Sequence, residues 1–132
     1  MAGNFKLGFD FPSEGFVQLA IEKFFANEGF QVVELRHADF CCLNPATGQK
    51  WIVEAKGKTT AIGLDFRTGI GQLIQRMEDE TANYAIAVPS LPQFHTQIKN
   101  IPYRVRMLLN LHILLVAQDG NVLVVNPQEV LE

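Results

Sequence analysis

The sequence has little charge and little cysteine. Its 132 residues carry 11 basic and 14 acidic side chains, for a net charge of −3, which excludes a protein held to nucleic acid by a broadly basic surface. The two cysteines, Cys41 and Cys42, are adjacent, so on a strand they would point to opposite faces and are poorly placed to form a disulfide with each other. Free cysteines are typical of a reducing compartment, and we therefore expect a cytoplasmic protein.

Long apolar runs are also missing. The longest one, 107–117, is interrupted by Asn110 and His112, whereas a membrane-spanning helix needs about 20 apolar residues. Residues 1–11 lack the basic and then apolar pattern of a secretion signal, so neither a membrane nor a secreted protein is predicted. Hydrophobic residues are plentiful, at 48% with ten phenylalanines, and predict a single domain over residues 1–132.

Capping and turn residues divide the chain into helical and extended segments. Ser13 is a suitable N-cap for a first helix that ends before Gly29. Apolar residues at helical spacing predict further helices at 66–79, 91–99 and 102–110. Extended segments are predicted at 31–36, 38–43, 50–56, 84–88, 112–118 and 121–126, with hairpin turns at 44–49 and at Asp119-Gly120. This order predicts a mixed α/β sandwich with helices on both faces of the sheet.

Glu54 interrupts an otherwise apolar strand, where an ionised carboxylate is costly unless it is paired. Strand alternation places Lys56 on the same face as Glu54. If Leu43 opposes Lys50 across the hairpin, then Asp39 opposes Glu54, with Cβ atoms about 5 Å apart. The sequence therefore predicts two acids and one base on one face of the sheet.

Two interpretations of these acids remain open. Two carboxylates this close repel each other, and a hard cation such as Mg²⁺ is bound well by one or two carboxylates and several waters. In the other interpretation, Asp39 and Glu54 pair with nearby bases at a solvated edge of the sheet.

Asp39, a hairpin connection and then Glu54-Ala55-Lys56 resemble the PD-(D/E)XK motif of restriction-endonuclease-like nucleases, although Ala38 stands where the motif has proline. The resemblance implies a three-layer sandwich, with a mixed central sheet and an αβββαβ core followed by a C-terminal helix and β-hairpin. It further implies Mg²⁺- or Mn²⁺-dependent hydrolysis of DNA phosphodiester bonds. Asp39, Glu54 and the carbonyl of Ala55 would be metal ligands, and Lys56 would serve the attacking water or the transition state.

The segment 65–77 is similar to several small nuclease-like families, including one linked to DNA-element excision in cyanobacteria. In those families a Gly-Gln pair opens the helix after the acid-any-lysine strand, which implies that Gln72 faces the site. A glutamine near a helix start can equally bond a neighbour. Relatives of the nuclease superfamily often carry an acid on the first helix. Glu14 is the candidate here, with an ordinary surface residue as the alternative.

Basic residues near the motif predict contacts to nucleic-acid phosphates, with Lys58, Arg67 and Arg76 as candidates. The leading hypothesis is a metal-dependent nuclease acting on DNA. The alternative is a catalytically inactive nuclease-fold module that binds DNA or a partner protein in DNA processing or element excision, and a coincidental motif is a third interpretation. The apolar final hairpin, 113–125, predicts an interface edge and a homodimer.

Overall fold

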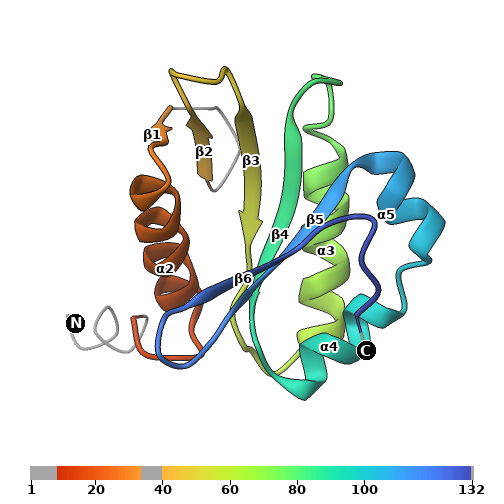
Figure 1. Cartoon of the computed structure of the whole chain (residues 1–132). Coiled ribbons are helices and arrows are strands. Elements are labelled where there is room, and N and C mark those ends of the chain that lie inside the picture. Colours follow the sequence, from red (N-terminus) through yellow and green to blue (C-terminus); the bar gives the residue numbers. More distant parts are fainter. Residues whose placement is uncertain (1–8, 34–39, 132) are drawn as a thin grey trace.

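The structure, a computed structural model, describes residues 9–33 and 40–131 (Figure 1). The helices of this part of the chain are α2 (Glu14–Asn27), α3 (Ile62–Ile74), α4 (Pro92–Lys99) and α5 (Tyr103–Leu109). The strands are β1 (Gln31–Val32), β2 (Phe40–Leu43), β3 (Lys50–Ala55), β4 (Asn83–Pro89), β5 (Leu111–Val116) and β6 (Val122–Val125). The order of elements is the predicted one.

The strands form one mixed sheet in the order β1-β2-β3-β4-β5-β6. β3, β4 and β5 are parallel neighbours, while β1, β2 and β6 add antiparallel pairs at the two sides. Leu43 pairs with Lys50 and Phe40 with Val53, which is the hairpin register that the sequence argument assumed. The turn residues of the 44–49 connection thus set the alignment of β2 against β3.

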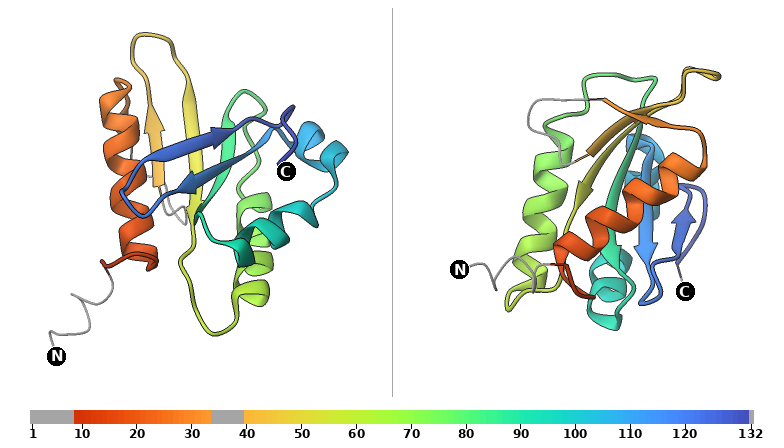
Figure 2. Two further views of the ribbon diagram at one scale, coloured as in Figure 1. Left: turned by 60° about the horizontal axis from the view of Figure 1, so that its bottom comes forward. Right: turned by 90° about the vertical axis from the view of Figure 1, so that its left-hand side faces the viewer.

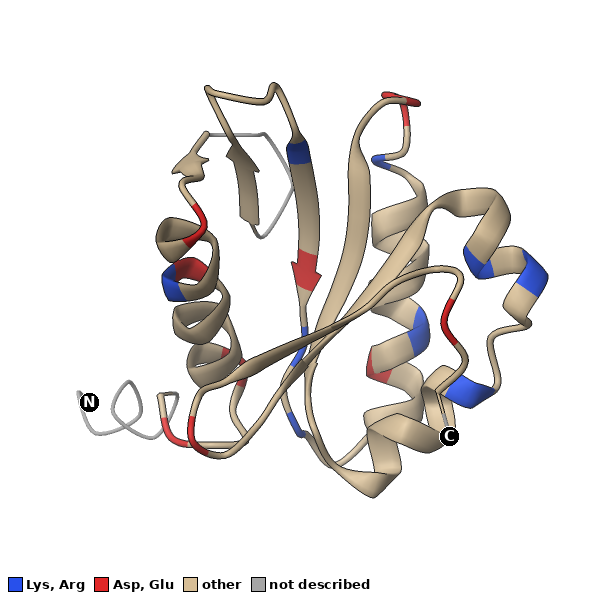
Figure 3. Ribbon diagram, in the orientation of Figure 1, with Lys and Arg blue, Asp and Glu red and all other residues tan. Residues whose placement is uncertain are grey.

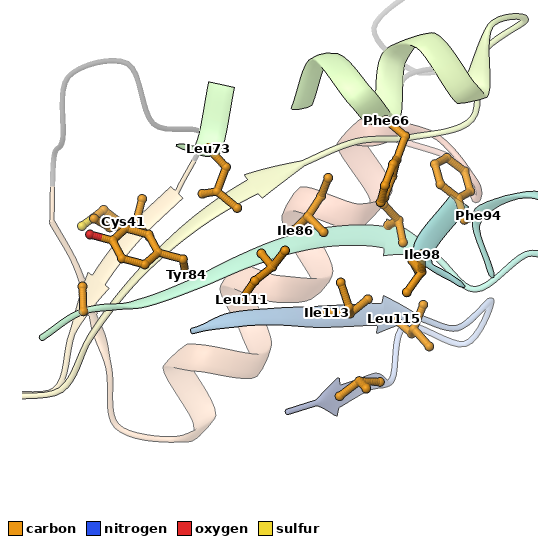
Figure 4. Packing of buried hydrophobic residues seen from close by; sticks show 14 residues of the cluster. Cys41, Phe66, Leu73, Tyr84, Ile86, Phe94, Ile98, Leu111, Ile113 and Leu115 are labelled. Atoms are coloured by element: carbon orange, nitrogen blue, oxygen red, sulfur yellow. The ribbon is translucent and has the colours of Figure 1, made fainter. Parts of the chain in front are cut away.

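Helices cover both faces of the sheet, and the three-layer α/β sandwich is confirmed (Figure 2). On one face α2 packs Val17, Ile21 and Phe25 against the strands. On the other face lie α3, α4 and α5, whose buried side chains include Phe66 and Leu73 (Figure 4). Residues of β3 alternate between the two faces as predicted, since they divide between the two apolar clusters.

α3 begins and ends four or five residues earlier than predicted, at Ile62 and Ile74 instead of 66 and 79. The acidic residues that extended the predicted helix lie in turns. After Ile74 the chain turns, because the backbone N–H groups of Arg76 and Met77 donate to carbonyls three residues earlier, and Oδ1 of Asp79 then accepts a hydrogen bond from the backbone N–H of Thr81 at 2.9 Å. Such local side-chain bonds compete with the helix.

The start of α2 is fixed by local and long-range contacts. Ser13 acts as the predicted N-cap, because its Oγ accepts a hydrogen bond from the backbone N–H of Phe16 at 3.2 Å. A Cβ on Gly57 would lie 2.0 Å from the backbone nitrogen of Glu14, so only glycine fits there. The backbone N–H of Lys58 also donates to the carbonyl of Pro12 at 2.9 Å. The end of β3 therefore lies directly against the first turn of α2.

Candidate functional site

Glu54 lies on β3, the third of the six strands, and is only 3% exposed. Its Oε1 accepts a hydrogen bond at 2.8 Å from Nη1 of Arg76, which follows the end of α3. The guanidinium supplies the positive charge that a carboxylate in this position requires. Glu54 does pair with a base, as the second interpretation supposed, but inside the sheet and not at a solvated edge.

Lys56 follows on the same side of the strand and is half-buried. Its backbone N–H donates to the carbonyl of Ala87 at 2.9 Å, which continues the pairing with β4. A Cβ on Gly69 of α3 would lie 2.9 Å from Cε of Lys56 and 3.2 Å from its Cγ. The aliphatic stem of the lysine therefore runs over a glycine of the helix, and Gly69 creates the room for it.

Gln72 lies near the end of α3, not at its start as the resemblance implied, and Arg76 follows the helix end by two residues. Oε1 of Gln72 and Nε of Arg76 are both buried, and neither has a hydrogen-bond partner within the described part of the chain. A buried polar atom without a partner costs about 1–3 kcal/mol. The buried Gln72 oxygen and Arg76 nitrogen are therefore notable, because the described residues leave both without a partner.

The remaining predicted residues are spread around this interface. Ala55 is fully buried on the opposite face, under α2, while Glu14 is exposed at the start of α2. Lys58 and Arg67 are exposed, in the loop after β3 and on α3 respectively. Asp39 lies outside the described residues. The pairing nearest to it, Phe40 with Val53, has the register that the sequence argument used.

Charges of both signs meet where β3 ends (Figure 3). The acidic band near the tip of the β3 arrow is followed by basic bands on the chain that leads toward α3. Glu54 and Lys56 thus form an α3–β3 interface, with Arg76 and Gly69 as their contacts, and Gln72 lies three residues beyond Gly69 on α3. Arg76, predicted to contact phosphate, is also there, with its guanidinium on Glu54. That pairing could not be predicted from spacing, because the partners are 22 residues apart.

The described residues offer oxygen donors of the right type for a divalent cation, but too few of them to hold it. The Glu54 carboxylate and the Gln72 amide oxygen are hard oxygen donors of the kind that Mg²⁺ accepts. No group of three or more His, Cys, Asp or Glu side chains able to hold a metal occurs in the described residues. A cation here would share the Glu54 carboxylate with Arg76 and would need further oxygen ligands from Asp39, Ala55 or water.

The chain is similar to a known protein in its fold. No protein-family model and no curated protein matches the sequence. Among solved structures, the chain is similar to an XisH family protein from Nostoc punctiforme PCC 73102, with a TM-score of 0.57 and 15% sequence identity. The match covers 81% of this chain and 95% of that one. The two proteins share a fold. This neighbour agrees with the looser resemblance of the α3 region to a small cyanobacterial family.

Two other buried groups lie outside the interface. Burial raises the pKa of the Cys42 thiol to about 12 and also raises the pKa of Cys41, which suits cysteines that pack in the core. Burial lowers the pKa of His112, whose ring packs against Trp51 at 4.5 Å on the α2 side of the sheet. Among the described residues, no helix is long and apolar enough to cross a membrane.

Proposed function

We propose that this chain is a DNA-processing protein that hydrolyses phosphodiester bonds with Mg²⁺ or Mn²⁺ at the α3–β3 interface. The observation that supports the proposal is the burial of Glu54 inside the sheet, with Lys56 two residues further along the same side of β3. The shared fold with an XisH family protein is compatible with a role in DNA-element excision. Residues 65–77 are also similar to a small family linked to that process.

Stability alone does not account for these residues. Replacing a buried ion pair by apolar side chains of similar volume is often neutral or stabilising, so a purely structural strand has no need of Glu54 and Arg76. Gln72 adds a buried oxygen that the described residues leave unpaired. Three polar groups that each oppose efficient packing therefore gather at one interface, as expected where a protein binds a charged ligand.

The roles follow from the chemistry of each group. Asp39, Glu54 and the carbonyl of Ala55 are the proposed ligands of the divalent ion, which when bound supplies a water of lowered pKa and neutralises phosphate charge. The ammonium of Lys56 stabilises charge that develops on the phosphate. Gln72 orients a phosphate oxygen or the lysine. Arg76 balances the Glu54 carboxylate while no cation is bound.

The direct test is cleavage of duplex and single-stranded DNA with Mg²⁺ or Mn²⁺. We expect Glu54→Gln and Lys56→Ala to abolish cleavage while circular dichroism shows a folded protein. Glu78→Gln is the matched control, because Glu78 is an exposed acid that lies just beyond Arg76. Cleavage by Glu54→Gln at the wild-type rate would overturn the assignment.

The Glu54–Arg76 ion pair favours a second function, that of a catalytically inactive module that binds DNA or a partner protein during DNA processing. A carboxylate already neutralised by arginine is a poorer metal ligand than a free one. Calorimetry with Mn²⁺ separates the two functions. Binding that tightens in Arg76→Gln supports the metal site, whereas absence of binding in both the wild type and Arg76→Gln, with DNA affinity retained, supports the inactive module.

A further inference from the structure

A polar hollow of about 360 Å³ adjoins the α3–β3 interface. It lies between the loop that follows β3 and the helix α4, which follows β4. Because β3 and β4 are parallel neighbours, the hollow sits at their carboxyl ends, and Thr59 on its rim is only three residues beyond Lys56. The side chains that give the hollow its polar character are Thr59, Thr60, Gln93, Thr96 and Gln97.

Two nitrogen-bearing side chains from different helices meet over a glycine in this hollow. A Cβ on Gly63 would lie 3.2 Å from Nη1 of Arg67 and 3.3 Å from Nε2 of Gln97. Gly63 belongs to the first turn of α3, where glycine is less favourable than alanine by about 0.5–1 kcal/mol. The glycine thus lets the ends of Arg67 and Gln97 approach the backbone of α3 closely, at a small cost in helix stability.

The charge around the hollow is on balance positive. Residues 57–74 carry two bases, Lys58 and Arg67, and a single acid, Asp65. The Asp65 carboxylate is engaged by the hydroxyl of Thr59, which donates a hydrogen bond to it, and the backbone N–H of Ala61 donates to that hydroxyl at 3.1 Å. These bonds order the loop and engage its acid, while Nη1 of Arg67 lies close to Gly63, which lines the hollow.

We propose that this hollow binds a backbone phosphate of a DNA strand, one that flanks the phosphate held at Glu54 and Lys56. The inference rests on the proposed DNA-processing function and adds a second anchoring point for the strand. Arginine, glutamine and threonine side chains are common donors to phosphate oxygens, and such contacts set the position and register of the nucleic acid. Nη1 of Arg67 and Nε2 of Gln97, which meet over Gly63, are the proposed donors to the phosphate oxygens.

Fluorescence anisotropy with a labelled DNA duplex, in the absence of divalent cations and over a range of salt concentrations, tests the hollow. We expect Arg67→Ala to weaken binding roughly 10-fold and to lower the salt slope by about 1, because one phosphate contact by a cation is lost. Gln97→Leu should weaken binding without changing the salt slope. The matched control is Arg104→Ala, because Arg104 is an exposed base on α5 and is not among the nearest neighbours of Gly63.

Gly63→Ala separates a binding role from a folding role. The added methyl group lies between Arg67 and Gln97, where the flexible ends of both side chains can shift, so the variant should fold with an unchanged or raised Tm. We expect it nevertheless to bind DNA more weakly. DNA affinity equal to the wild type in Arg67→Ala, Gln97→Leu and Gly63→Ala would overturn the phosphate site.

Two further outcomes keep this proposal distinct from the hydrolytic one. If Glu54→Gln loses cleavage while the three hollow variants bind DNA normally, the hollow fails and the active site stands. If Glu54→Gln cleaves normally while Arg67→Ala loses DNA affinity, the active site fails and the hollow stands. Stabilisation of the wild type but not of Arg67→Ala by inorganic phosphate, with equal DNA affinities, would identify a free-phosphate site and overturn binding of a DNA strand.

Discussion

The two faces of β3 are buried to a similar degree but carry different chemistry. Under α2 the strand presents Val53 and Ala55, both fully buried. Under α3 it presents Ile52 and then Glu54, both 3% exposed. Val53 and Ala55 show that apolar residues alone can close a face of this strand, whereas the other face of the same strand carries an ionised pair.

Deletion of an aromatic ring under α2 should have the largest effect on stability. Phe25 is 2% exposed and lies with its ring centroid 5.1–5.6 Å from those of four other aromatic residues, which are Phe24, Phe30, Phe40 and Trp51. We expect Phe25→Ala to lower the free energy of unfolding by about 3–5 kcal/mol in urea titrations. Leu19→Ala, at a 44% exposed position of the same helix, is the control, and an equal loss in both variants would contradict the prediction.

Disruption of the ion pair under α3 should rank second. Glu54→Gln leaves the Arg76 guanidinium, 17% exposed, without its counter-charge and should cost about 2 kcal/mol. The double variant Glu54→Leu with Arg76→Leu turns this face into one like the α2 face and should return to within about 1 kcal/mol of the wild type.

A double-mutant cycle of urea titrations, with Glu54→Leu and Arg76→Leu as its single variants, measures this recovery. The control is Lys50→Gln, which removes an ion pair on the surface. In this pair Nζ of Lys50 lies 3.8 Å from Oδ2 of Asp79, and its loss should cost less than about 1 kcal/mol. Destabilisation of the double variant by the full sum of the single substitutions would show that Glu54 and Arg76 do not act as a structural unit.

The α2 face should respond to acid through His112. Its Nδ1 lies 3.2 Å from the carbonyl oxygens of Tyr84 and Asn110, and burial lowers its pKa below the ordinary value. The stabilisation due to the neutral ring is therefore complete above the ordinary pKa of histidine, about 6.5, and is lost as the pH falls through the lower folded-state pKa. Thermal unfolding should show a steeper loss of Tm from about pH 7 to 5 in the wild type than in His112→Phe. Equal slopes would contradict this.

The two edges of the sheet also differ from each other, and a substitution at an edge should cause the smallest change in stability. One edge, β1, has only two residues, whereas β6 has four uncharged residues, of which Leu123 is 61% exposed. We propose that β6 pairs with a second copy of the chain. Leu123→Lys should shift sedimentation toward the monomer and change the free energy of unfolding of the monomer by less than about 0.5 kcal/mol. A wild-type protein that sediments as a monomer at all concentrations would overturn the dimer.

Features set by local sequence could be predicted. The cap at Ser13 and the hairpin at Asp119-Gly120 depend on a few neighbouring residues, and Gly120 has the positive φ of 90° that such a turn needs. The turn at 44–49 fixed the β2–β3 register, and with it the face on which Glu54 lies. The three-layer arrangement followed from the order of these elements.

Features set by distant residues could not be predicted. Arg76 reaches Glu54 across 22 residues, and no spacing rule connects a residue beyond a helix end with a strand. The end of α3 was misplaced because apolar spacing continues to Met77, whereas the backbone already turns after Ile74 and Asp79 bonds Thr81 locally. The role of Asp39 stays a prediction, since this residue lies outside the described part of the chain.

The close approach of Gly57 to the first turn of α2 ties the two layers of the molecule together. Gly57 follows Lys56 directly, and its contact with α2 is one of backbone against backbone. A displacement of α2 should therefore move the end of β3 as well. Substitutions that shift α2 should therefore alter activity at a site on the other side of the sheet. In a screen for loss of function, inactive variants should map to the first turn of α2 as well as to the α3–β3 interface.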